Sequence, residues 1–310
     1  MAFSARRLVD HPIIYGDMDD RMGRNINGPS LIRAPDWLPS PPGRYLLYFA
    51  DHKGTYLRLA YADALEGPWS MHTPGCLDLA DSLFPTRLLA KGARPAWVER
   101  APQWYYPHIA SPDVHVDDET QEICMYFHGM LCSGEQATRM ARSRDGLTFS
   151  VNEELLGPPY FRTFQQGGFR YAFALPNHLM RSALGTDAFE PGPTPLPPST
   201  RHTAVRLRGE GLEVFWSEIG DAPERIYAGR IDLTGDWTTW QLEDKHEVLR
   251  AELDWEGALE PPTASAAGAV DGLVNQLRDP CVFEEDGRLY LLYSASGEAA
   301  IGIAELTETA

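Results

Sequence analysis

Three short segments near the end of the chain decide the fold: Arg278–Phe283 (RDPCVF), Gly287–Ser294 (GRLYLLYS) and Ala300–Leu306 (AIGIAEL). Each is rich in apolar, β-branched or aromatic residues, a composition typical of strands, and turn-forming residues separate one from the next. The same order of a polar or proline-containing start, an apolar strand, an aromatic strand and a further strand occurs five times in the 310 residues. Such a repeat predicts one structural unit for each copy.

The other copies begin near residues 27, 111, 157 and 201, and spacers of roughly 71–107 and 243–277 interrupt the series. Repeats of about 40 residues with three or four strands each are typical of a β-propeller. We therefore predict an all-β fold: a five-bladed β-propeller with a central polar funnel. Residues 1–310 would form a single domain whose blades start near 27, 111, 157, 201 and 278. An irregular β-sandwich of similar length is the alternative.

The charge balance and the cysteines limit the class of protein. The chain has 44 acidic and 27 basic residues and a formal net charge of −17, which disfavours nucleic acids and anionic membranes as partners. No apolar run follows Arg6 and Arg7, and no stretch approaches 18 apolar residues. The four cysteines match no zinc spacing. We expect a cytoplasmic protein with reduced thiols.

The blade starts resemble those of the five-bladed glycosidases, above all the family 43 glycoside hydrolases. The segments that carry this resemblance are Asn27–Ile32 (NGPSLI), Ser111–Val114 (SPDV), Leu156–Pro158 (LGP), His202 and Arg278–Pro280 (RDP). Ile219–Ile226 (IGDAPERI) and Tyr56–Asp63 (YLRLAYAD) are similar to segments of uncharacterised glycosidase-like proteins. The resemblance implies a glycoside hydrolase that acts on a small oligosaccharide or glycoside, with a small-molecule carbohydrate as its partner.

Only part of the catalytic pattern implied by the resemblance is present. Family 43 enzymes carry an Asp base on blade one, a second Asp on blade two and a Glu acid on blade three. Asp113 matches the second of these, whereas Gly28 and Leu156 stand where the other two carboxylates would be. Glycoside hydrolysis needs a pair of carboxyl groups, so we predict that Asp113 shares the acid and base roles with Asp279 or Glu224.

Other polar residues near the blade starts are predicted to bind the substrate: Asn27, His52, His108, Tyr160, Arg162, His202, Arg225 and Arg278. An arginine at position 162 that faced the funnel would favour a uronate sugar, because a guanidinium binds a carboxylate through two hydrogen bonds. No cofactor is expected, although His108, His202 and Asp113 together would suit a divalent cation. Two alternatives stay open: a lyase on the same fold with a histidine base, and a sugar-binding propeller that has lost its catalytic carboxylates.

Overall fold

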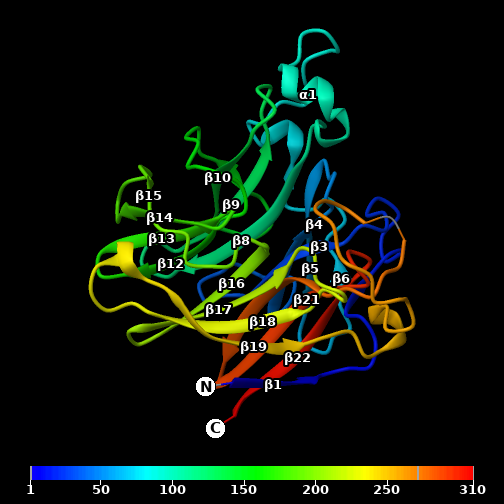
Figure 1. Ribbon diagram of the computed structural model, residues 1–310, viewed down its shortest axis with the longest axis vertical. Helices are drawn as coiled ribbons and strands as arrows, with labels where there is room; N and C mark the ends of the chain where they lie inside the picture. Colours follow the sequence, from blue (N-terminus) through cyan, green and yellow to red (C-terminus); the bar gives the residue numbers. More distant parts are fainter. Residues whose placement is uncertain (1, 271, 310) are drawn as a thin grey trace.

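The computed structural model describes residues 2–270 and 272–309, and this part of the chain forms five antiparallel sheets (Figure 1). Each sheet is one blade, and in the first four blades the strands follow one another in sequence order from the innermost strand outward. The predicted all-β five-bladed propeller is confirmed. The blades start at residues 27, 109, 162, 200 and 278, so the third begins at Arg162 rather than near residue 157.

The first three blades have an innermost strand of five to nine residues and end in an outer strand of two residues. Blade one contains β3 (Asn27–Arg33), β4 (Tyr45–Ala50), β5 (Tyr56–Ala62) and β6 (Ser70–Met71), and β7 (Leu77–Asp78) also pairs with β5. Blade two contains β8 (Ile109–Asp117), β9 (Glu122–Met130), β10 (Gln136–Ser143) and β11 (Ser150–Val151). Blade three contains β12 (Arg162–Gln166), β13 (Phe169–Ala174), β14 (His178–Ala183) and β15 (Glu190–Pro191).

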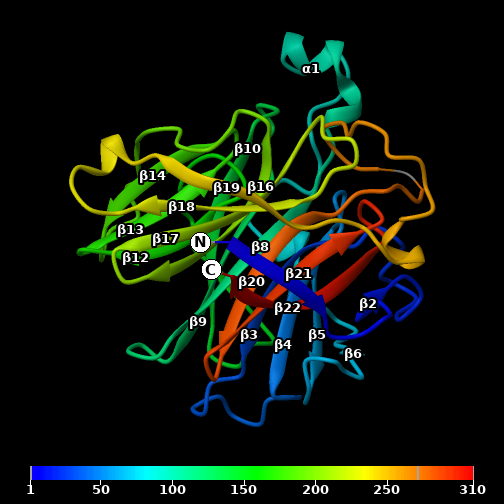
Figure 2. The same cartoon turned by 60° about the horizontal axis from the view of Figure 1, so that its bottom comes forward.

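The last blade is built from both ends of the chain. Blade four contains β16 (Thr200–Arg208), β17 (Gly211–Glu218), β18 (Ile226–Asp232) and β19 (Leu242–Leu249). Blade five contains β20 (Arg278–Glu285), β21 (Arg288–Ala295), β22 (Ala300–Thr309), β1 (Ala2–Arg7) and β2 (Ile14–Tyr15). Because β1 pairs antiparallel with β22, the two termini lie side by side and the N-terminal strand completes blade five (Figure 2). This pairing joins the two ends of the ring.

The hydrophobic core lies between the blades, in one cluster for each pair of neighbours. Successive side chains of a strand point to opposite faces of its sheet, so a central strand packs against both neighbouring blades. In β4, Leu46 and Tyr48 pack toward blade two, whereas Leu47 and Phe49 pack toward blade five. Equivalent clusters lie between blades two and three, three and four, and four and five. Five such interfaces close the ring around a central channel.

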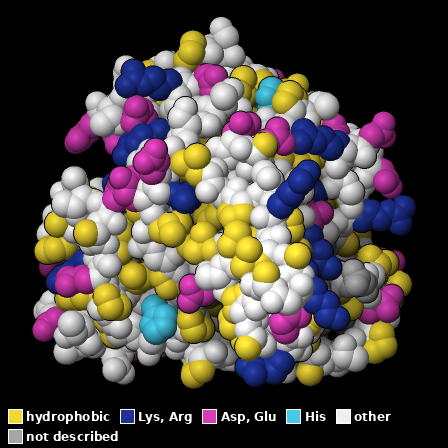
Figure 3. Space-filling view, turned by 90° about the horizontal axis from the view of Figure 1, so that it is seen from above, with side chains coloured by type: hydrophobic (Ala, Val, Ile, Leu, Met, Phe, Trp, Pro, Cys, Tyr) yellow, Lys and Arg dark blue, Asp and Glu magenta, His cyan; other side chains and the backbone are white. Residues whose placement is uncertain are grey.

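The helical segments are few and short. They are α1 (Ala96–Arg100) and the 3₁₀ turns η1 (Leu79–Asp81), η2 (Pro102–Trp104), η3 (Trp237–Thr239) and η4 (Asp254–Glu256). Among the described residues, no helix has the length and apolar character needed to cross a membrane. The segment with α1 stands away from the blades at one end of the molecule (Figure 1). On the face seen from that end, hydrophobic side chains gather near the middle, with acidic and basic side chains spread around them (Figure 3).

Candidate active site

The innermost strands β3, β8, β12, β16 and β20 begin at the same end of the channel, which we call the mouth. Four of them contain a bulge in the first few residues, and such bulges redirect side chains. Gly28, Ser111 and Asp279 each precede a proline and have φ values of 60°, 53° and 48°. A Cβ atom at Gly28 would lie 3.2 Å from the Ser111 backbone. Blade one therefore has little room at this position for the carboxylate that the family pattern places there.

Asp279 joins three blades at the centre of the mouth. Its Oδ2 atom accepts hydrogen bonds from the Gly28 backbone N–H (3.3 Å) and from the Ser294 hydroxyl (3.2 Å). Its Oδ1 atom contacts His202 Nδ1 of blade four. The side chain is almost fully buried, with a residue exposure of 1%. A non-glycine residue at positive φ is strained, and here these contacts hold it in place.

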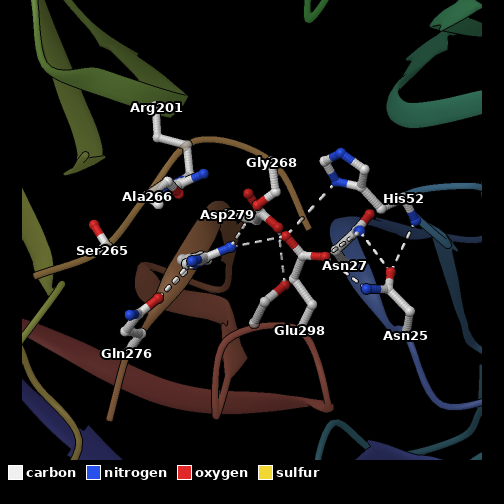
Figure 4. Close-up of polar contacts among 12 residues, drawn as sticks. Asn25, Asn27, His52, Arg201, Ser265, Ala266, Gly268, Gln276, Asp279 and Glu298 are labelled. Atoms are coloured by element: carbon white, nitrogen blue, oxygen red, sulfur yellow. Dashed lines mark hydrogen bonds and ion pairs between the residues drawn. The ribbon is translucent and has the colours of Figure 1, made fainter. Parts of the chain in front are cut away.

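Glu298 is the second carboxylate of the mouth and lies in the turn between β21 and β22 (Figure 4). It accepts hydrogen bonds from Arg278 Nη1 (3.0 Å), Asn25 Nδ2 (2.6 Å) and Asn27 Nδ2 (3.4 Å). His52 Nδ1 lies 3.7 Å from its Oε1 atom. Burial alone would raise the pKa of Glu298, but the contacts with His52, Arg278 and Asn25 outweigh it and lower that pKa to about 2. Glu298 is therefore ionised at neutral pH.

Glu224 binds two arginines rather than facing open space. Its carboxylate accepts hydrogen bonds from Arg201 Nε (2.7 Å), Arg201 Nη2 (3.1 Å) and the Ser217 hydroxyl (2.7 Å). Arg278 Nε lies 3.3 Å from its Oε2 atom, and Gln276 accepts a further hydrogen bond from Arg278 Nε. Glu224 has no exposed surface. Its role in the mouth is to hold and neutralise the Arg201 and Arg278 guanidinium groups.

A continuous series of tilted and edge-to-face ring contacts crosses blades two, three and four. The centroids of Tyr106, His108, His128, Tyr160 and His202 follow at 4.8, 5.6, 4.2 and 4.4 Å. Burial lowers the pKa of His108 to about 4, and it lowers the pKa of His128 and of His202 well below the usual value. The three imidazoles are therefore uncharged at neutral pH, and the series of ring contacts ends where His202 meets Asp279.

A segment between β19 and β20 covers the mouth, and we call residues 261–269 the strap. The carbonyl of Ala266 accepts a hydrogen bond from Arg201 Nη2 (2.6 Å), and the carbonyl of Gly268 accepts one from Arg278 Nη1 (3.2 Å) (Figure 4). Gly268 lies against the ring of Trp104 so closely that a Cβ atom would come within 2.3 Å of it. In both ribbon views this orange segment reaches the base of the segment that carries α1. The strap and Trp104 close the mouth to solvent.

Asp113 and Arg162 lie deeper, where the mouth meets the channel. Asp113 accepts hydrogen bonds from the backbone N–H and the hydroxyl of Thr163 (2.9 and 3.2 Å), and His115 Nε2 lies 2.8 Å away. Burial would raise the pKa of Asp113, but the charges and hydrogen bonds of His115, Arg162 and Thr163 lower it below its usual range. Arg162 donates from Nη1 to the carbonyls of Ser111 (3.3 Å) and Phe161 (2.9 Å).

The structure brings most of the predicted residues together, but not all. Residues gathered in or around the mouth are Asn27, His52, His108, Tyr160, His202, Glu224, Arg278 and Asp279. Arg225 is not among them, because it pairs with Glu247 (3.0 Å) and Asp221 (3.5 Å). In residues 2–270 and 272–309, no group of three or more His, Cys, Asp or Glu side chains is arranged to hold a metal ion.

Sequence reasoning missed four residues of the mouth: Asn25, Arg201, Gln276 and Glu298. A signal for Glu298 was present, since it follows the aromatic strand of blade five just as His52 follows that of blade one. Arg201 stands next to His202, which was recognised. Asn25 and Gln276 lie just before the innermost strands β3 and β20, at positions without an apolar pattern.

Comparison with known proteins places the chain in a family. No family model matches it. An uncharacterized protein of Acanthamoeba polyphaga mimivirus is 34% identical over an alignment of 308 residues that covers 91% of this chain and 83% of the viral protein. The chain belongs to the family of this viral protein. Because this relative is uncharacterised, membership of its family assigns no reaction to the chain.

Solved structures with the same fold are glycoside hydrolases of family 43. One is a β-xylosidase/α-arabinofuranosidase from a compost microbial metagenome, in complex with xylotriose, with a TM-score of 0.63 and 12% identity over 99% of this chain and 96% of that one. A second is a family 43 enzyme from Xanthomonas citri, with a TM-score of 0.61 and 12% identity over 99% of this chain and 91% of that one. The chain therefore has the five-bladed propeller fold of these hydrolases, as the resemblance implied.

Proposed function

We propose that the protein is a carbohydrate hydrolase that cleaves a small oligosaccharide or glycoside at the mouth of the propeller. One observation carries the proposal. Two buried carboxylates of blade five, Asp279 and Glu298, meet side chains of blades one and four at the end of the channel where all five innermost strands begin. The fold shared with family 43 glycoside hydrolases supports a reaction at a carbohydrate.

In the proposed reaction the two carboxylates have the different roles that acid–base hydrolysis needs. Glu298, with a pKa of about 2, is ionised and can accept a proton from an attacking water molecule. Asp279 Oδ1 and His202 Nδ1 are in contact, and two such atoms repel one another unless a hydrogen lies between them. In this proposal that hydrogen is the proton of a protonated Asp279 carboxyl group, which donates to the uncharged His202 Nδ1 and can pass to the departing glycosidic oxygen. Water adds to the anomeric carbon as the C–O bond breaks.

The rest of the mouth suits a neutral sugar. Glu224 and Glu298 neutralise the charges of Arg201 and Arg278, so neither guanidinium group would attract an anionic substrate strongly. Their N–H groups that now bind the strap carbonyls are the donors that substrate hydroxyls would use. The uronate suggested by Arg162 is not part of this proposal, because the nearby Asp113 carboxylate offsets that arginine. It stays a prediction, as does the cytoplasmic location.

Substrate can reach Asp279 and Glu298 only after the strap moves. Asn27, Asp279 and Glu298 are exposed by 5%, 1% and 4%, so the closed mouth admits no sugar. The strap contains Pro261, Pro262 and a run of small residues from Ala264 to Ala269, none in a helix or strand. The strap can therefore leave the mouth by breaking the hydrogen bonds of Ser265, Ala266 and Gly268, without disrupting a sheet.

A panel of aryl glycosides and short neutral oligosaccharides tests the proposal. We expect Asp279→Asn and Glu298→Gln each to lower kcat/KM by about 10²–10⁴-fold. Glu305→Gln is the matched control, because this carboxylate is also on blade five but pairs with Arg6 of β1 and Arg288 of β21, away from the mouth, and it should keep full activity. Full activity of both mouth variants would refute the assigned roles.

The products separate this proposal from the two alternatives. Hydrolysis releases a saturated reducing sugar, which reducing-end assays and mass spectrometry detect. An unsaturated sugar among the products would instead identify a lyase. Saturable sugar binding by the wild type without turnover of any panel member would identify a sugar-binding propeller.

A further inference from the structure

The channel opens into a second cavity at the end opposite the mouth, which we call the far cavity. It has a volume of about 570 Å³ and is lined by residues from all five innermost strands. Its opening lies where β3, β8 and β20 end, beside Trp37, Asp118 and Glu284. This volume falls within the roughly 300–1,000 Å³ of small-molecule sites. The far cavity is not covered by the strap and is reached without opening the mouth.

The inner end of the far cavity presents hydrogen-bonding atoms that the protein leaves unused. Asp113 and Arg162 line it and are exposed by only 9% and 6%. Asp113 Oδ2 accepts hydrogen bonds from Thr163 and contacts His115 Nε2. No donor in the described chain lies within hydrogen-bond distance of Asp113 Oδ1. Likewise, Arg162 uses Nη1, and none of the described residues offers an acceptor to Nε or Nη2. An acceptor and two donors thus face the same space.

Apolar side chains line the walls, and aromatic rings lie beside charged side chains at the rim. Val116, Val205 and Val282 line the cavity between its inner end and its opening. Trp37 and Phe283 lie near the opening, and the Trp37 indole is held in place because its N–H donates to Asp118 Oδ1 (2.8 Å). A sugar ring has hydroxyl groups at its edge and C–H groups on its faces, so it fits polar atoms at the end of a cavity and an aromatic ring at its side.

The charges around the cavity favour a neutral ligand over an anion. The charged side chains that line it are Arg33, Arg162, Asp36, Asp113, Asp118 and Glu284. These four acidic and two basic side chains give the cavity a net negative charge, which repels an anion. Of the four acids, Glu284 is paired with an arginine outside the cavity, Arg206. Asp113 interacts electrostatically with Arg162, which lowers the pKa of Asp113 and offsets the charge of the arginine.

We propose that the far cavity is a second binding site, for one ring of a neutral polyhydroxylated molecule such as a monosaccharide. Asp113 Oδ1 accepts from a ligand hydroxyl, Arg162 donates to ring or hydroxyl oxygens, and Trp37 packs against one face of the ring. The site does not depend on the proposed hydrolysis, because none of these three residues belongs to the acid–base pair of the mouth.

Ligand-observed NMR titrations with D-xylose as the neutral probe and D-glucuronate as the anionic one test this site. We expect saturable binding of D-xylose and at least tenfold weaker binding of D-glucuronate. Asp113→Asn keeps the shape but removes the charged acceptor, and it should weaken D-xylose binding about tenfold. Val116→Phe fills the cavity and should abolish binding. Val151→Phe, on the outer strand of the same blade and outside the cavity, is the matched control and should bind like the wild type.

Glu298→Gln separates the two sites, because it should lose turnover and keep the binding of D-xylose that Val116→Phe removes. Circular dichroism of each variant shows whether it is folded, and Asp113→Asn keeps the test informative if Val116→Phe is not. Three results would overturn the inference: no saturable D-xylose binding, binding unchanged by both cavity variants, or tighter binding of D-glucuronate.

Discussion

Replacement of Gly268 by alanine should open the strap, and the size of the effect can be worked out from the structure. Gly268 has a φ of +86°, and an alanine Cβ there would lie 2.3 Å from the Trp104 ring. The backbone strain alone costs about 1–2 kcal/mol. The overlap adds to this cost. Because the overlap can be relieved only by separating the strap from Trp104, the closed form also loses that contact. We expect the strap to open at least tenfold more often.

Gly272→Ala is the matched control, because Gly272 has a φ of +91° but a Cβ atom there would meet nothing within 4 Å. It carries the same strain without the overlap. Hydrogen exchange by mass spectrometry reports opening through the Ser265 amide, which bonds to the Asp221 carbonyl, and the Gly220 amide, which bonds to Ser265. Exchange at these amides should be at least tenfold faster in Gly268→Ala than in Gly272→Ala. Equal exchange in the two variants would refute the account of the strap.

Three further predictions concern charge and pH. Folding lowers the pKa of Glu298 to about 2, so its ionised form stabilises the fold above the unfolded pKa of about 4.5. The wild type should therefore lose stability in urea unfolding as the pH falls from 4.5 to 2. Glu298→Gln should lose less stability over the same interval. Folding also lowers the pKa of His108 to about 4, so the folded protein should lose stability between pH 6.5 and 4, and His108→Gln should lose less over that interval. If Asp113 offsets Arg162, Arg162→Ala should leave the ratio of uronoside to neutral glycoside turnover unchanged, whereas a selective loss of uronoside turnover would support the uronate prediction.

The sequence was enough to predict the blades and much of the mouth. In β4 the alternation of Leu46 and Leu47 between two neighbouring blades is a local pattern with a period of two, which a single sequence displays. The Arg278–Pro280 motif likewise placed Asp279 at the start of an innermost strand, where the structure has it.

Roles within the mouth were less accessible, as neighbouring residues show. Glu224 and Arg225 are adjacent in sequence, yet Glu224 is buried between Arg201 and Arg278 while Arg225 pairs with Glu247 and Asp221. Nothing in the sequence distinguishes a carboxylate that binds two arginines from one that is free to react. The same holds for Asp113, whose partners Thr163 and His115 come from two different blades.

By itself the sequence determined that five sheets form and which side chains face the neighbouring blades, because those properties depend on residues a few positions apart. Only the tertiary structure decided that Glu298 joins Asp279 and that the strap closes over them. These contacts link turns and loops without a repeating pattern, and they exist only once ring closure brings blade five against blade one and blade four. Partners that meet through such closure leave no periodic signal in the chain.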